Sequence, residues 1–170
     1  MDRRTPSVGP ATRRLTARQL TVWRSLMDTM EELSWRLTAQ LQQVGLSAGD
    51  YLVMLALSEA AGHRLRSSEL ADAIGWQRSR LSHHLGRMER HGLVRRQKCP
   101  TDSRGAVVTI TDEGLRSFRL ASAPHLRAVK HYFADALTEH QFEELESILT
   151  AVRTHLADLG QEADSERRCS

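Results

Sequence analysis

Residues 67–114 decide the fold of this chain: SSELADAIGWQRSRLSHHLGRMERHGLVRRQKCPTDSRGAVVTITDEG. They describe a short helix, a tight turn at Gly75 and a second helix rich in arginine and histidine. Gly92 ends that helix, and two β-prone runs then flank a polar tip at 100–105. This order predicts a winged helix-turn-helix, a module that presents one helix to the DNA major groove and a β-wing to the neighbouring backbone.

The two helices of this module show signals for a cap and for a buried face. A serine at 67–68 is expected to cap the first helix. In the second helix, about 77–91, Leu81, Leu85 and Met88 recur at 4-and-3 spacing. That spacing predicts a buried stripe opposite a basic surface.

The wing is expected to form from two strands. Residues 94–98 and 106–110 are β-prone and should pair across the polar tip. The short segment 64–66 is a candidate for a third strand beside them. The sequence therefore predicts a small sheet attached to a helical body.

Long helices surround the module. Apolar periodicity predicts helices over 16–43 and from 47 to about 62. A further helix should run from 112 to about 137, with Pro124 kinking or dividing it, and a final one should start at Thr138. The predicted fold class is mainly α with a small β-wing: a winged helix-turn-helix with long N- and C-terminal dimerisation helices.

These elements give a domain plan. It consists of a flexible N-terminal arm at 1–14, one domain at 15–160 and a disordered tail at 161–170, with the winged helix-turn-helix at about 47–111 and dimerisation helices at about 16–43 and 112–159. The terminal helices carry more apolar surface than one small module can bury, which favours a second copy of the chain as partner.

The net charge of +3 is unevenly distributed along the 170 residues. Residues 63–104 hold ten Lys and Arg against four Asp and Glu, a balance of +6, which leaves −3 for the rest. A basic block on a mildly acidic body is typical of a module that faces phosphates. A solvated arginine-rich surface is the plainer alternative, and it does not explain the helix-turn-helix pattern.

Other classes of protein find little support. The apolar run 51–57 is too short to span a bilayer, and the N-terminus has no apolar signal region, so we expect a cytoplasmic protein without a membrane partner. Cys99 and Cys169 lack the spacing of a disulfide framework or zinc site, and the adjacent His83 and His84 diverge on a helix. We expect no metal, no cofactor and no enzymatic activity.

The chain resembles the MarR family of bacterial winged helix-turn-helix transcriptional regulators over about residues 16–158. The residues that carry the resemblance are Ser68-Glu-Leu-Ala71, Gly75, Leu81-Ser82, Arg87-Met-Glu89, Gly92-Leu-Val-Arg-Arg96, Asp102-Ser-Arg-Gly105 and Ile110-Thr-Asp-Glu-Gly114. Two positions depart from the family pattern. Gln77 opens the second helix where Ser or Thr is common, and Gly86 lies inside it at a cost of about 1 kcal/mol.

The resemblance implies a homodimer that binds double-stranded DNA at an inverted-repeat, palindromic operator, usually as a repressor. It also implies release by a small aromatic or phenolic effector, or by cysteine oxidation in one branch of the family. The reactive cysteine of that branch lies on the first helix, and residues 16–43 contain no cysteine. Redox sensing would therefore have to use Cys99. A regulator without an effector, or an activator, is the other alternative.

The candidate DNA contacts lie on the second helix and the wing. Arginine can bind guanine through two hydrogen bonds, Ser and His suit phosphates or thymine methyl groups, and an arginine beside a glycine at the wing tip can enter the minor groove. The candidates are Arg78, Ser79, Arg80, Ser82, His83, Arg87, Arg95, Arg96, Lys98, Ser103 and Arg104.

The candidate effector site lies where the first, second and post-wing helices should meet. Methionine adapts to irregular shapes, and Trp and Tyr offer a flat face with one polar group. The candidates are Trp23, Met27, Met30, Tyr51 and Met54. The same residues would also serve as ordinary core.

Overall fold

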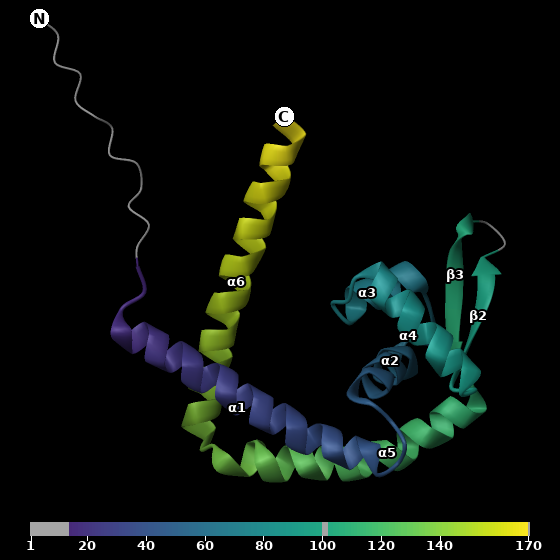
Figure 1. The fold of residues 1–170 in the computed structure, drawn as a ribbon, viewed down its shortest axis with the longest axis horizontal. Coiled ribbons are helices and arrows are strands. Elements are labelled where there is room, and N and C mark those ends of the chain that lie inside the picture. The colour runs from purple at the N-terminus through teal and green to yellow at the C-terminus, as the bar shows by residue number, and fades with distance from the viewer. Residues whose placement is uncertain (1–13, 100–101, 170) are drawn as a thin grey trace, which may run out of the picture.

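The computed structural model describes residues 14–99 and 102–169, which form a mainly helical fold with a small three-stranded sheet (Figure 1). The elements in chain order are α1 (Ala17–Gln42), α2 (Ala48–Glu59), η1 (Ala61–His63), β1 (Arg64–Arg66), α3 (Ser67–Ala73), α4 (Arg78–Arg90), β2 (Val94–Cys99), β3 (Asp102–Ile110), α5 (Asp112–Tyr132), η2 (Ala134–Ala136) and α6 (Glu139–Cys169). The predicted fold class is confirmed.

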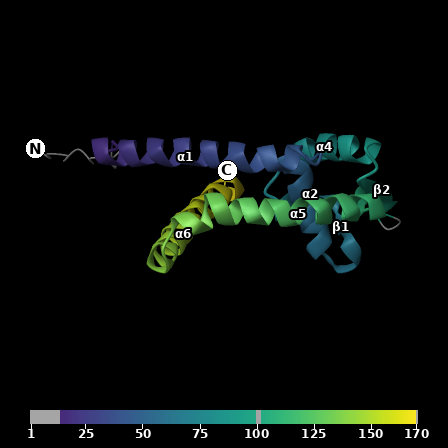
Figure 2. The same ribbon diagram turned by 90° about the horizontal axis from the view of Figure 1, so that it is seen from below.

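The elements separate into a winged module and a set of long helices. Helices α2, α3 and α4 gather beside the wing strands, while α1, α5 and α6 extend away from them (Figure 1). Figure 2 shows α1 and α5 side by side, and the two helices are in contact. Helix α5 also packs against α2, so it joins the winged module to the long helices.

The hydrophobic core lies inside the winged module and reaches the helices that flank it. Its largest fully buried side chains come from α2, α3, α4 and the sheet: Met54, Leu57, Leu70, Leu81, Leu85, Met88, Val53, Val94 and Val108. The predicted stripe on α4 therefore faces inward as its spacing requires.

Most helices begin and end at the capping residues that the sequence predicts. Thr16, Ser47 and Thr138 form capping boxes with the residue three positions later. At the end of α4, Gly92 has a φ of 71° and donates to the Glu89 carbonyl, while Leu93 donates to Met88. This pair of bonds is a Schellman motif, which needs a residue in the left-handed region and so favours glycine.

The start of α3 differs from the prediction that Ser67 or Ser68 caps it. The cap residue is Arg66, whose backbone N–H donates to Glu69 Oε2 at 2.9 Å. Ser67 is already helical and donates its hydroxyl to the Ala106 carbonyl at 3.1 Å. The prediction was wrong because strand β1 runs directly into the helix, and Ser67 is drawn to the neighbouring strand.

The wing has the predicted pairing. Strand β3 lies between β1 and β2, antiparallel to both. Val94 pairs with Ile110, and the register continues to Lys98 opposite Ala106 before a shift at Cys99. The segment 64–66 is the third strand, as expected.

Two differences concern the C-terminal half. Helix α5 continues from Asp112 to Tyr132 with Pro124 inside it, so the alternative that Pro124 divides the helix is wrong. Ala121 and Ala128, one turn to either side, are both buried, and this packing holds the helix together despite the lost backbone donor. The backbone of α6 is helical through Cys169, whereas the sequence predicts a disordered tail from residue 161.

The flexible arm predicted at 1–14 lies almost entirely outside the described residues, which begin at Arg14.

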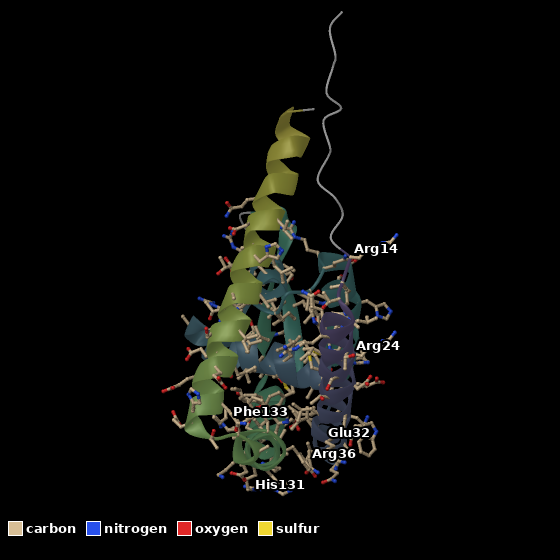
Figure 3. The ribbon with its side chains drawn as sticks, turned by 90° about the vertical axis from the view of Figure 1, so that its left-hand side faces the viewer. Arg14, Arg24, Glu32, Arg36, His131 and Phe133 are labelled. Carbon is tan, nitrogen blue, oxygen red and sulfur yellow. The ribbon has the colours of Figure 1, made fainter. Side chains whose placement is uncertain are left out.

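A polar contact supplements the apolar packing between α1 and the end of α5. The Arg36 guanidinium lies 5.5 Å from the centre of the Tyr132 ring, and its Nε donates to Glu32 Oε1 at 2.7 Å. Figure 3 shows Glu32 and Arg36 on α1, near the end of α5 marked by His131 and Phe133. This contact joins the C-terminal half of α1 to the end of α5.

Candidate nucleic-acid interface

Helix α4 presents a basic polar face to the outside. Its buried stripe of Leu81, Leu85 and Met88 fixes the rotation of the helix against the core. The rest of its first turns is exposed and carries five of the predicted DNA contacts, namely Arg78, Ser79, Arg80, Ser82 and His83. Gln77 is the cap residue and makes no side-chain cap hydrogen bond, as its departure from the family pattern suggests.

Arg87 lies on the same helix but is turned toward α2. Its Nη2 donates to Ser47 Oγ at 3.2 Å and to Asp50 Oδ1 at 3.3 Å. The side chain is still partly exposed, so some of its N–H groups remain accessible. Arg87 therefore connects the exposed face of α4 to the first turn of α2.

Asp50 is the centre of this connection. It is buried, and it accepts hydrogen bonds from the backbone N–H of Ser47 at 2.9 Å and from its hydroxyl at 2.6 Å. Burial raises the pKa of Asp50, but the bonds from Ser47 and the nearby His84 and Arg87 lower it by more, so the net pKa is below its ordinary value. The carboxylate is thus held in its charged form between two helices.

His84 faces Asp50 from the inner side of α4. Its Nε2 lies 3.0 Å from Asp50 Oδ1, and its Nδ1 lies 3.3 Å from Arg87 Nη2. Arginine can only donate, so Nδ1 accepts and the proton of the neutral ring belongs on Nε2, facing the carboxylate. Burial lowers the pKa of His84 and Asp50 opposes that shift, with Arg87 and Arg80 adding to the lowering.

Trp76 completes this cluster in the turn between α3 and α4. Its indole meets the His84 ring edge-on, with centroids 5.0 Å apart, and the Arg80 guanidinium lies over it at 4.1 Å. A Cβ on Gly49 would lie 2.9 Å from the indole and 2.7 Å from the His84 ring, so α2 approaches both rings closely. Neither Trp76 nor Asp50 is among the site residues predicted from the sequence; the only local signal is that Trp76 precedes Arg80 by four residues and His84 by eight.

The two arginines of strand β2 have different surroundings. Arg95 is exposed. Arg96 is half-buried, and both its backbone N–H and its Nε donate to the Glu89 carboxylate at 2.9 Å. These bonds lower the pKa of Glu89. The side chains of Lys98, Ser103 and Arg104 lie outside the part of the chain that the structure describes.

A hollow of about 260 Å³ lies where α3, α4 and the sheet meet. It is lined by Ser67, Ser68, Arg78, Leu81, Ser82, Leu85, Arg96 and Ala106. Two arginines and three serines therefore line one depression beside the first turn of α4, where the Ser67 hydroxyl and Arg96 Nε already donate to Ala106 and Glu89.

The five candidate effector residues fall into two groups. Trp23, Met27 and Met30 are exposed on α1, whereas Tyr51 and Met54 are buried on α2. Trp23 lines an apolar hollow with other α1 residues, which contains neither α2 side chain.

Tyr51 has an aromatic environment of its own. Its ring centre lies 5.3 Å from that of Phe118 and 4.5 Å from that of His125, both on α5. Nδ1 of His125 is buried and is without a hydrogen-bond partner among the described residues.

Within residues 14–99 and 102–169, no three His, Cys, Asp or Glu side chains gather in a way that would hold a metal ion. No helix in this part of the chain is long and apolar enough to cross a membrane.

A basic helix exposed over a packed helix-turn-helix, next to a three-stranded wing, defines a winged-helix DNA-binding protein. A model of the MarR family matches residues 44–105. AbsC, a MarR family transcriptional regulator from Streptomyces coelicolor, is 37% identical, with 86% of this chain and 99% of AbsC covered at a TM-score of 0.81.

Two further relatives agree with this likeness. Sco3205, a MarR family transcriptional regulator from the same organism whose structure is a complex with DNA, is 38% identical, with 85% of this chain and 91% of that one covered and a TM-score of 0.79. The HTH-type transcriptional repressor YetL of Bacillus subtilis is 26% identical over 124 residues, which are 71% of this chain and 74% of YetL.

The chain belongs to the MarR family. It is a DNA-binding transcriptional regulator and not an enzyme.

Proposed function

We propose that the chain acts as a homodimeric repressor on an inverted-repeat operator in the bacterial cytoplasm. The observation that carries the proposal is the exposed face formed by Arg78, Ser79, Arg80, Ser82 and His83 on the first turns of α4, inside a segment of charge +6. Sco3205 is described in complex with DNA, and YetL carries the name of a repressor, which supports the assignment.

The proposed contacts divide by chemistry. Arg78 and Arg80 read base edges, because their exposed guanidiniums start the helix that enters the groove. Arg95 and Lys98 neutralise phosphates along the wing, and Arg104 enters the minor groove.

Ser79, Ser82, His83 and Ser103 add bonds to phosphates. Arg87 and Arg96 already pair with Asp50 and Glu89, so we assign them mainly to holding the interface in shape.

Exposed apolar side chains on the terminal helices support a dimer. On α1 and α6 they include Leu20, Val22, Trp23, Leu26, Met27, Met30, Ile148, Leu149, Val152, Leu156 and Leu159, and Leu15 lies just before α1. An apolar surface of this extent is unusual on a monomer and fits a two-fold interface between copies of the chain. The three α1 candidates for effector binding, Trp23, Met27 and Met30, therefore belong to this interface in the present proposal.

The effector part of the proposal centres on Tyr51. Phe118 and His125 stand against its ring where α5 joins the winged module to the long helices. A small phenol or aromatic acid would offer a flat ring to this group and a polar atom to His125 Nδ1. Met54 lies in the adjacent core and would shape the floor of the site. An effector-independent regulator, an activator and a redox sensor acting through Cys99 are the alternatives.

Selection of bound fragments from random DNA tests the core of this proposal. The selected sequence should be an inverted repeat with half-sites about one helical turn apart. Enrichment of no sequence, or tight binding to a single half-site, would contradict it.

Calorimetry with aromatic acids and phenols, with and without operator, tests the effector. Because coupling is reciprocal, operator must weaken binding of a true effector by the factor by which that effector weakens operator binding. An oxidant that releases wild type but not Cys99→Ser from DNA would favour the redox alternative.

A further inference from the structure

The Trp76 indole makes two contacts that lie on the DNA-facing helix. The guanidinium carbon of Arg80 lies 4.1 Å above its ring centre, and the His84 ring meets it edge-on at 84°. Arg80 and His84 are four residues apart and therefore lie on the same side of α4. One aromatic side chain from the preceding turn thus touches two successive turns of the helix.

The position of Trp76 is itself fixed from several sides. Gly75 has a φ of 66° and donates to Asp72, while the Trp76 backbone N–H donates to the Ala71 carbonyl at 2.9 Å. These bonds form the Schellman stop of α3, so the indole starts from a rigid point. Its ring packs against the core and is approached closely by Gly49 on α2.

His84 is fixed from the opposite side. Asp50 Oδ1 lies 3.0 Å from His84 Nε2, and Arg87 Nη2 lies 3.3 Å from His84 Nδ1. The ring that contacts the indole is therefore held by the first turn of α2. A continuous set of contacts runs from the buried Asp50 through His84 and Trp76 to the exposed Arg80.

An arginine has many rotamers in solution, and most of them do not direct both N–H edges at one base. Stacking on an aromatic face confines the guanidinium plane but leaves its edges free to donate. Arg80 is exposed while it stacks, so a guanine can still meet it by two parallel hydrogen bonds.

We infer that Trp76 is a specificity-determining positioning residue, which holds Arg80 in the orientation that reads a base. The inference rests on the proposed function and adds the partner through which Arg80 gains its selectivity. Trp76 itself is half-buried and acts on DNA through Arg80.

The test compares the affinity for the selected operator with that for scrambled DNA of the same length. Trp76→Leu keeps an apolar side chain but removes the aromatic face, so the ratio of the two affinities should fall about threefold to tenfold. Trp76→Phe keeps a smaller face and should retain most of the ratio. In an Arg80→Ala background, Trp76→Leu should cause no further fall.

Ile74→Val is the matched control, because Ile74 packs against the same core from the same turn. It should leave the ratio unchanged. Thermal unfolding of every variant separates loss of fold from loss of selectivity, and the Trp76→Phe cycle with Arg80→Ala gives the same comparison if the leucine variant unfolds.

Two results would overturn the inference alone: an unchanged ratio in folded Trp76→Leu, or effects of Trp76→Leu and Arg80→Ala that add in full. If wild-type protein enriches no DNA sequence, the proposed function fails first and the inference fails with it.

Discussion

Asp50 on α2 and His84 on α4 stand 34 residues apart in sequence, and their side chains meet at 3.0 Å between Oδ1 and Nε2. The contact joins the capping box at the start of α2 to the inner side of α4, the helix proposed to face DNA. Because Arg87 approaches the other nitrogen of the ring, protonation of His84 would place a proton against an arginine donor. The ring is therefore suited to the neutral form.

This arrangement makes stability depend on pH. Burial lowers the pKa of His84 below its ordinary 6.5, so the unfolded chain binds a proton at a pH where the native ring does not. Stability should therefore fall as the pH decreases from about 6.5 toward the lower pKa of the native state. His125, whose pKa burial also lowers, acts in the same direction. Chemical denaturation at a series of pH values measures the slope.

Replacing His84 by glutamine should flatten part of that slope, because glutamine can donate to Asp50 and does not titrate. Leu85→Val, a neighbouring core change, should lower stability at every pH and keep the wild-type slope. An equal slope in wild type and His84→Gln would show that His84 does not titrate differently in the two states.

The fold follows from signals that are local in the sequence. The capping threonine Thr16 and the glycine Gly92 act within one helical turn of themselves, and the stripe through Leu81 needs only the helical period. Ser67 shows the limit of such signals. Its hydroxyl bonds to Ala106, 39 residues away, and no pattern around 67–68 carries that information.

The sequence predicts which residues of the candidate DNA interface are exposed, but it does not predict which side chains they contact. All the arginines on the polar side of α4 look alike in sequence, yet Arg80 stacks on Trp76 whereas Arg87 binds Asp50. In the sequence, Asp50 can be recognised only as the N3 residue of the capping box that Ser47 begins. Its role between two helices depends on how α2 packs against α4, which is a property of the assembled core.

Gly86 lies in the interior of α4, where glycine is a poor helix former. A Cβ there would come no closer than 3.8 Å to Arg96 Nη2, an ordinary contact. Gly86→Ala should therefore stabilise the protein by about 0.5–1 kcal/mol, a rise of about 1–4 °C in Tm. Gly92→Ala is the matched control with the opposite expected effect. The φ of 71° at this position disfavours alanine, so this substitution should lower Tm. A lower Tm for Gly86→Ala would contradict the expected gain.

Arg80 and Arg95 are both exposed but are expected to act differently on DNA. Arg80→Ala should weaken operator binding by about 1–3 kcal/mol and relax the preference at one base pair in each half-site. Arg95→Ala should weaken binding to all sequences alike and reduce the salt dependence of the affinity by about one phosphate contact. Titrations on operator and scrambled DNA at several salt concentrations distinguish them. Equal loss on both DNAs with Arg80→Ala would argue against base reading.

The proposed dimer interface can be tested by replacing each of three valines, one at a time, with glutamate. Val22 on α1, Val152 on α6 and Val44 in the α1–α2 turn are 60%, 52% and 42% exposed. A glutamate buried in an apolar interface without a partner is costly, whereas the same glutamate in water is not. Val22→Glu and Val152→Glu should therefore shift the protein toward monomer in sedimentation at micromolar concentration and weaken operator binding, while Val44→Glu should remain dimeric. A wild-type protein that sediments as a folded monomer, or a dimer unaffected by both interface variants, would rule out this assignment of the terminal helices.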